Sequence, residues 1–334
     1  MQVNELFRQS NTILLDGGMG TMLQAAGLKL GARPEELNIT DPALIEGIHG
    51  QYAAAGSRIV NANTFGASAH KLAGSAYTLE QVITAGIENC KRACAPYGAL
   101  TALDVGPLGE LLEPSGTLAF EDAVAEYARI VKAGEAAGAD LIFFETYTDL
   151  YELKAALLAA KENTHLPILA SMSFEAGGRT FTGCTVESFA ATARGLGADA
   201  VGINCSLGPK EIFPMAKRLA EAVPGNFPVF VKPNAGLPRA DGSGYDITPQ
   251  LFALQMKPYR ELHLFAAGGC CGTTPEFIKL LNGTFAGCTP GRPAHRMPSV
   301  LCTPVDTVTV DGITVVGERI NPTGKKRFQQ ALRE

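Results

Sequence analysis

The sequence predicts an α/β fold, a (β/α)8 barrel over residues 1–290 with a C-terminal linker extension. Short apolar segments alternate with longer amphipathic ones, there are eight of the short segments, and polar residues or cysteines follow nearly all of them. Near-continuous apolar strands separated by helices are typical of a parallel sheet that is buried on both faces. A doubly wound open sheet is the alternative, and it fits less well because its polar residues would gather at one crevice.

The eight predicted strands recur at regular intervals along the chain. They are residues 12–18, 58–65, 99–107, 140–147, 167–174, 200–206, 227–236 and 262–272. Most of the intervals have helix character: over 117–138, for example, Phe120, Val124 and Tyr127 recur at spacings of three and four, as on one face of a helix. Eight such units over about 280 residues have the number and the size of a TIM barrel.

Residues 291–334 follow the eighth unit and predict a different kind of structure. Residues 291–300 are punctuated by proline, and the next segment predicts two short strands around a turn at Asp311-Gly312, followed by the start of a C-terminal helix. Because this segment is too small to bury a core of its own, we expect a linker and the truncated start of a further domain.

The amino-acid composition argues against several classes of protein. The chain has 334 residues, of which 46% are hydrophobic, and 28 Lys and Arg against 33 Asp and Glu leave a formal net charge of −5. This balance offers no basic surface for nucleic acid. No apolar run approaches the roughly 20 residues that a membrane helix needs, and no signal peptide is apparent. Eight cysteines are too few for a disulfide scaffold, so we expect a cytoplasmic protein whose clustered thiols bind metal or take part in catalysis.

Polar side chains and thiols stand at the carboxyl ends of the predicted strands. In a barrel of this type the active site forms at these ends, so the residues there are candidates for chemistry. In chain order they are Asp16, Gly17 and Gly18; Asn61, Asn63 and Thr64; Asp104; Glu145 and Thr146; Asn204 and Cys205; Asn234; and Cys270 and Cys271. We therefore expect these residues to converge on one mouth of the barrel.

The three cysteines in this set, Cys205, Cys270 and Cys271, suggest a zinc site. Three protein ligands with a fourth position left open are typical of catalytic zinc, whereas structural zinc sites close with four. Thiolate ligands favour a soft or borderline metal over magnesium or calcium. On the residues alone, a redox pair and an inert buried pair remain alternatives for the adjacent cysteines. The glycines around the pair, Gly268, Gly269 and Gly272, would let the backbone turn sharply.

The segment DGGMGT, residues 16–21, predicts an amino-acid site rather than a nucleotide site. It lacks the lysine of a phosphate-binding loop and the full dinucleotide fingerprint. The Gly17-Gly18 backbone amides could bind a carboxylate, while Asp16 and Glu145 could bind an ammonium group. The alternatives are a helix N-cap for Asp16 and a solvated charge at the end of a loop for Glu145.

Several segments in this order resemble the homocysteine S-methyltransferase family. They are LLDGGMGT, NANTFGAS, FFET, GINCS, PNAG and GGCCGTTPEF, and the resemblance covers about residues 10–290. Within the family, the chain is most similar to the N-terminal homocysteine-binding modules of cobalamin-dependent methionine synthases. The segment VVGERINPTGKK, residues 315–326, resembles the start of the methyltetrahydrofolate-binding (pterin-binding) barrel that follows in those enzymes.

The resemblance implies a reaction and a set of ligands. Cys205, Cys270 and Cys271 would bind Zn2+, the homocysteine thiolate would take the fourth position, and Asn234 would be a substitute metal ligand without substrate. Asp16 and Glu145 would bind the substrate ammonium, with Gly17-Gly18 near its carboxylate. A zinc-bound thiol is deprotonated, so it could accept a methyl group without a separate general base and give methionine.

The resemblance also implies partners. The methyl donor would be methylcobalamin carried on a missing or separate domain, and domains or subunits that bind cobalamin and methyltetrahydrofolate would be needed. One alternative is a stand-alone homocysteine S-methyltransferase that uses another donor, such as betaine or S-methylmethionine; the tail at 315–326 argues against it. Another is a module that binds zinc and homocysteine and is inactive without partner domains.

Overall fold

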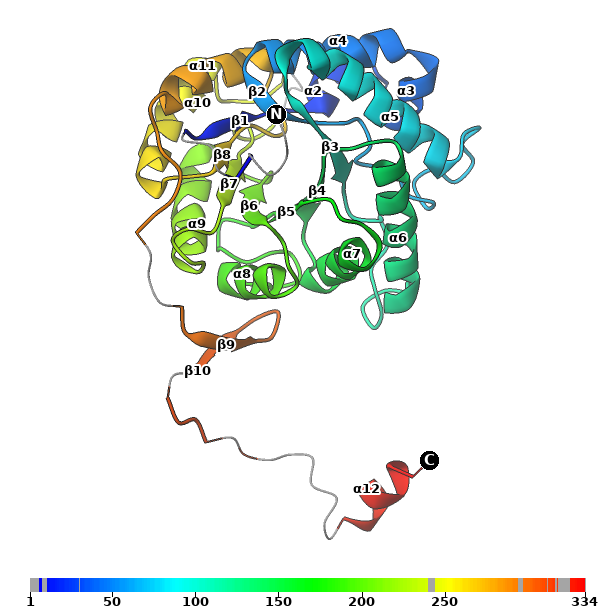
Figure 1. The fold of residues 1–334 in the computed structure, drawn as a ribbon, viewed down its shortest axis with the longest axis vertical. Helices are drawn as coiled ribbons and strands as arrows, with labels where there is room; N and C mark the ends of the chain where they lie inside the picture. Colours follow the sequence, from blue (N-terminus) through cyan, green and yellow to red (C-terminus); the bar gives the residue numbers. More distant parts are fainter. Residues whose placement is uncertain are drawn as a thin grey trace.

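The computed structural model describes residues 6–7, 11–29, 31–239, 244–293, 297–310, 312–315, 317 and 325–333. Eight parallel strands form a closed barrel in chain order, from β1 to β8, and helices surround it (Figure 1). The strands are β1 Ile13–Leu15, β2 Ser57–Asn61, β3 Leu100–Val105, β4 Leu141–Tyr147, β5 Ile168–Met172, β6 Ala200–Asn204, β7 Val229–Lys232 and β8 Ala266–Ala267. The predicted (β/α)8 barrel is confirmed. Most strands end before their predicted carboxyl limits, because the chain turns there into the loops of the mouth.

The helices follow the strands around the outside of the barrel. The α-helices are α2 Met19–Ala25, α3 Leu37–Thr40, α4 Pro42–Ala54, α5 Leu79–Cys94, α6 Phe120–Ala136, α7 Leu150–Asn163, α8 Val186–Gly195, α9 Pro209–Glu221, α10 Pro249–Met256 and α11 Pro275–Phe285, with short 3-10 turns at Pro34–Glu36, Ala95–Tyr97 and Lys257–Leu262. Helix α6 matches the helix predicted over 117–138, and it buries Tyr127 and Val131 toward the sheet. A capping box of Thr78 and Gln81 begins α5.

The barrel interior is apolar at one end and polar at the other. Alternate residues of each strand point inward, and the inner apolar cluster includes Leu141, Phe143 and Phe230. The Phe143 and Phe230 rings meet with their centroids 5.0 Å apart. Two residues further along the same strands stand Glu145 and Lys232, so the inward positions change from apolar to charged toward the carboxyl ends. The apolar side chains thus fill the barrel beneath the charged residues of the mouth.

The C-terminal extension forms a hairpin that differs from the prediction. Strand β9 (Ser299–Cys302) pairs antiparallel with β10 (Thr307–Val310), so the turn lies at residues 303–306. The strand predicted after Asp311-Gly312 is absent, since the described residues 312–315 form no strand. The predicted turn itself includes Asp311, which lies outside the described residues. The earlier turn closes because Thr303 Oγ1 accepts the Asp306 N–H at 3.1 Å. The C-terminal helix is confirmed as α12 (Lys326–Ala331).

The hairpin turn contacts the start of α8. Thr185 N–H donates to the carbonyl of Pro304 at 3.1 Å, and Ser188 Oγ donates to the carbonyl of Asp306 at 3.3 Å. Of the residues described from 297 onward, none is buried, so the extension adds no core. A membrane-spanning helix is absent from the described part of the chain, since no helix there combines the required length and hydropathy.

Candidate active site at the barrel mouth

A cavity of about 330 Å³ opens at the carboxyl ends of the strands. It is lined by residues that the sequence singled out, namely Asp16, Gly17, Gly18, Asn61, Asn63, Asp104, Glu145, Thr146, Cys205, Cys270 and Cys271. Asn234 lies beside the cavity, where its Oδ1 accepts the Cys271 N–H at 3.1 Å. Residues from strands far apart in the sequence are thus brought to one place. Lys232 and Tyr245 also line the cavity, and neither was predicted.

The three thiols form a cluster with the dimensions of a metal site. The Sγ atoms of Cys205, Cys270 and Cys271 all lie within 4.8 Å of one another, and those of Cys205 and Cys271 are 3.8 Å apart. A tetrahedral zinc ion with Zn–S bonds of about 2.3 Å holds its sulfurs about 3.8 Å apart. The donor set and its spacing therefore fit zinc.

Strained backbone and close packing aim these thiols. Cys205 has a positive φ of 62°, which is uncommon for a residue with a side chain, and its N–H donates to the Lys232 carbonyl at 3.1 Å. Gly272 has a φ of 79°, as a sharp turn after the cysteine pair requires. Gly268 and Gly269 have no such conformation. They are needed because a Cβ on Gly268 would lie 2.7 Å from Leu15 Cβ, and one on Gly269 would collide with Thr273.

Two asparagines, Asn204 and Asn234, contact the cysteines of the cluster. Asn204 Nδ2 donates to Cys270 Sγ at 3.8 Å and to Thr146 Oγ1 at 2.7 Å. Asn234 Oδ1 accepts the Cys271 N–H, and the Asn234 side chain is one of the groups that lower the pKa of Cys205. Both asparagines are buried, so they fix the orientation of the sulfurs.

The three thiols differ strongly in their pKa values. Hydrogen bonds from the Cys270 and Cys271 side chains lower the pKa of Cys205 to about 3. The same contacts raise the pKa of Cys271 to about 12 and that of Cys270 well above its ordinary value. One thiolate held by two thiols is the resulting arrangement, and it is a ready donor set for a soft cation.

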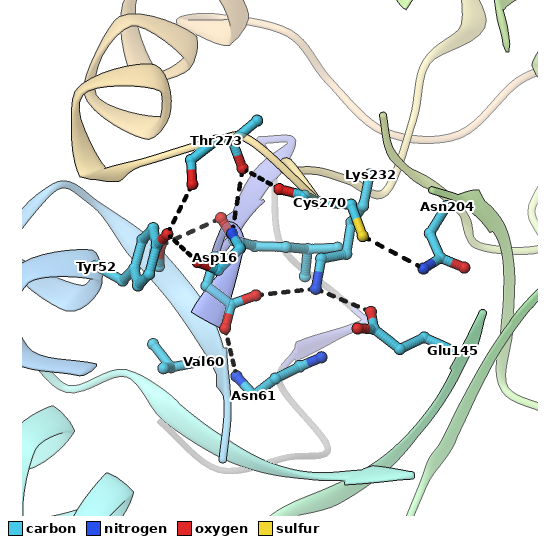
Figure 2. A network of polar contacts seen from close by, with 12 residues as sticks. Asp16, Tyr52, Val60, Asn61, Glu145, Asn204, Lys232, Cys270 and Thr273 are labelled. Atoms are coloured by element: carbon cyan, nitrogen blue, oxygen red, sulfur yellow. Dashed lines mark hydrogen bonds and ion pairs between the residues drawn. The ribbon is translucent and has the colours of Figure 1, made fainter. Parts of the chain in front are cut away.

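Lys232 joins the two carboxylates that the sequence assigned to the substrate. Its Nζ lies 3.0 Å from Asp16 Oδ1 and 3.0 Å from Glu145 Oε2, and Figure 2 shows it between them. It also lies 5.0 Å from the centre of the Phe143 ring. Asp16 Oδ2 accepts the Asn61 N–H at 2.7 Å. The carboxylates therefore face an internal ammonium group.

In this group, opposite charges offset the effect of burial on the pKa of each side chain. Burial raises the pKa of Asp16 and of Glu145, and Lys232 opposes that rise. Burial would lower the pKa of Lys232, but the two carboxylates raise it well above its ordinary value, so the lysine is charged. Asp104 is less well compensated: burial and Glu145 raise its pKa well above the usual range, and its Oδ1 has no hydrogen-bond partner among the described residues.

The alternatives considered for Asp16 and Glu145 are wrong. The N-cap of α2 is Gly18 and no side chain caps it, so Asp16 is not a helix cap. Glu145 is 8% exposed and paired, so it is not a solvated charge. Gly18 N–H donates to Thr273 Oγ1 at 3.2 Å, and a Cβ on Gly18 would lie 2.8 Å from the Cys270 carbonyl. This loop is glycine-rich because the loop after β8 packs directly on it.

Comparisons with known proteins identify a family. The sequence model of a family described as homocysteine S-methyltransferase matches residues 13–285. Methionine synthase of Mycobacterium tuberculosis (strain ATCC 25618 / H37Rv) is 32% identical over 343 residues, and that of Mycobacterium leprae (strain TN) is 32% identical over 350; each match covers 95% of this chain. The chain spans 28% of the length of each of these two relatives.

Solved structures show the same fold. The oxidised form of the homocysteine methyltransferase MmuM from Escherichia coli superposes with a TM-score of 0.73 at 23% identity, over 84% of this chain and 98% of that one. The metallated form of the same protein gives a TM-score of 0.69 at 24% identity, over 84% and 99% of the two chains. This likeness supports the barrel architecture.

Proposed function

Because this chain belongs to the homocysteine S-methyltransferase family, we propose that its barrel binds homocysteine at the mouth and presents the thiol for methylation to methionine. The observation that carries the proposal is the cavity in which three thiols stand beside two buried carboxylates. An amino acid with a side-chain thiol has the two groups that such a cavity would recognise, a soft sulfur and an ammonium.

We propose that Cys205, Cys270 and Cys271 bind zinc. The sulfur spacing and the donor set support this ion. When bound, zinc keeps a coordinated thiol deprotonated and nucleophilic at neutral pH. Asn204 and Asn234 keep the sulfurs oriented, and Asn234, which accepts the Cys271 N–H, would be a substitute ligand, as the resemblance implies.

For the rest of the substrate, we propose that Asp16 and Glu145 bind the ammonium group and that the Gly17-Gly18 segment binds the carboxylate. Both acids lie in the cavity wall with the thiols. Since Gly18 N–H already donates to Thr273, the carboxylate would depend more on Gly17. Held at both ends, homocysteine would present its sulfur at a fixed place in the mouth, where the reacting methyl group must arrive.

We propose methylcobalamin, carried on another domain or subunit, as the donor, in a reducing compartment such as the cytoplasm. The segment at 315–326 supports this choice over betaine or S-methylmethionine, since it resembles the start of a methyltetrahydrofolate-binding barrel. Residues 291–334 would be a linker and the start of a domain that binds methyltetrahydrofolate. The hairpin and the exposed α12 agree with that role; most of the motif at 315–326 lies outside the described residues.

Turnover with three donors tests the proposal. The zinc-loaded chain should convert homocysteine to methionine with added methylcobalamin, and Cys205→Ala should not. Turnover with betaine or S-methylmethionine instead would identify a stand-alone enzyme. Binding of homocysteine without turnover on any donor would identify a module that depends on its partner domains. Absence of homocysteine binding by the zinc-loaded chain would reject the function.

A further inference from the structure

Lys232 occupies the position between two carboxylates that a substrate ammonium would take. The side chains of Lys232, Asp16 and Glu145 are only 2%, 5% and 10% exposed, so water does not screen their pairing. A lysine ammonium and an α-ammonium are the same chemical group, each with three N–H donors. The two would therefore compete for the same carboxylate oxygens.

Asp104 offers a second place for the lysine ammonium. It ends the inward face of β3, lines the same cavity and is 7% exposed, and no described residue hydrogen-bonds its Oδ1. The charge of Lys232 already acts on the Asp104 carboxyl group. Because a lysine has a flexible four-carbon stem, its Nζ can move between neighbouring acceptors while its backbone stays in the strand.

We propose that Lys232 is an internal substitute for the ammonium group of the amino-acid substrate. Before substrate binds, Nζ pairs with Asp16 and Glu145; the substrate ammonium then takes these carboxylates and Nζ moves to Asp104. This rests on the proposed function, which makes the substrate homocysteine. The exchange of one ammonium for another keeps Asp16 and Glu145 paired both before and after the substrate binds. It also lowers the affinity for the substrate, since an internal competitor must be displaced first.

Lys232→Met in the zinc-loaded chain tests the exchange by calorimetry with two ligands. One is L-homocysteine, and the other is 4-sulfanylbutanoate, which has the same thiol and carboxylate but no amino group. The dissociation constant of homocysteine should fall by about tenfold, because the competing cation is gone. The affinity for 4-sulfanylbutanoate should not change, since that ligand displaces no ammonium. A lysine with a purely structural role would not produce this difference between the ligands.

The other outcomes are distinct. Weaker homocysteine binding in Lys232→Met would mean that the lysine contacts the substrate directly, and unchanged binding would mean a structural ion pair; either result overturns the substitution. If homocysteine binds the wild type but does not bind Lys232→Met more tightly, the proposed function stands and the proposed role of Lys232 is rejected. If homocysteine does not bind the zinc-loaded wild type, both fall.

Asp104→Asn is a second variant that keeps the question decidable if Lys232→Met does not fold. It is nearly isosteric and removes the negative charge that would pair with the displaced Nζ, so homocysteine should bind about fivefold more weakly with 4-sulfanylbutanoate unaffected. Unchanged homocysteine binding would contradict the exchange. In the Lys232→Met background the Asp104→Asn effect should vanish, whereas its persistence would place Asp104 in contact with the substrate.

Discussion

Two pairs of thiols in this barrel have the same separation and different surroundings. Cys90 and Cys94 lie one turn apart on α5 with their Sγ atoms 3.8 Å apart. Cys205 and Cys271 are 66 residues apart in the chain, and their Sγ atoms are also 3.8 Å apart. The first pair is sealed between helix and sheet, with Cys90 donating to the Val60 carbonyl. The second lines the cavity at the mouth.

The difference teaches that spacing alone does not make a metal site. No third metal-ligating side chain joins Cys90 and Cys94 within the described part of the chain, whereas Cys270 completes the other set. Burial raises the pKa of Cys90 well above its usual value, while thiol donors lower that of Cys205 to about 3. The cysteines at the mouth differ from the Cys90–Cys94 pair in three ways: they include a third sulfur, one of them is a stabilised thiolate, and they are accessible from the mouth.

The largest expected effect is the loss of zinc from the mouth. Replacement of Cys205, Cys270 or Cys271 by Ala should weaken zinc binding by about a thousandfold, because each removal leaves an incomplete ligand shell. Metal analysis should find one equivalent in the wild type and almost none in these variants. Cys90→Ala is the matched control and should keep its zinc. Full zinc occupancy in all three mouth variants would refute the site.

The next effect is the pH dependence of zinc binding. Near neutral pH the lowered pKa leaves Cys205 ionised, while Cys270 and Cys271, with raised pKa values, keep their protons. Zinc must displace those protons, so its affinity should rise with pH, by about a hundredfold per unit if about two protons leave. Calorimetry in buffers of different ionisation enthalpy counts them. A count of three would mean that Cys205 is protonated without metal.

A smaller effect is expected at the carboxylate beside the thiols. Glu145→Gln should weaken homocysteine binding by about 1.5–3 kcal/mol, because a charge-assisted hydrogen bond is lost in a buried place. Zinc content should stay at one equivalent, which metal analysis on the same sample checks. Loss of zinc with unchanged homocysteine affinity would instead move Glu145 into the metal shell.

The smallest expected effect concerns the helix pair, Cys90 and Cys94. Cys90→Ala should lower the free energy of unfolding by about 1–2 kcal/mol, since it leaves a small cavity in a packed layer. Urea unfolding measures this change, and zinc and homocysteine binding should be those of the wild type. A change in zinc affinity would show that the helix pair is coupled to the mouth.

Much of the site could be predicted because strand ends in a parallel barrel all meet at one mouth. The polar residues that follow apolar strands, from Asp16 to Cys271, needed no knowledge of contacts. Lys232 was missed although a signal was present: it lies two residues after the inward-facing Phe230 in β7, so it had to point inward as well. Tyr245 carries no comparable signal, because it lies in a loop whose path only packing decides.

The sequence by itself determined the eight strands, their helices and the three thiols at the mouth, because local periodicity and the residues at strand ends encode them. Only the tertiary structure decided which groups pair. Lys232 with Asp16 and Glu145, Cys205 with Cys271 and β9 with β10 depend on chain segments meeting in space. Those pairings set charge and hydrogen bonding, which no single segment of the sequence contains.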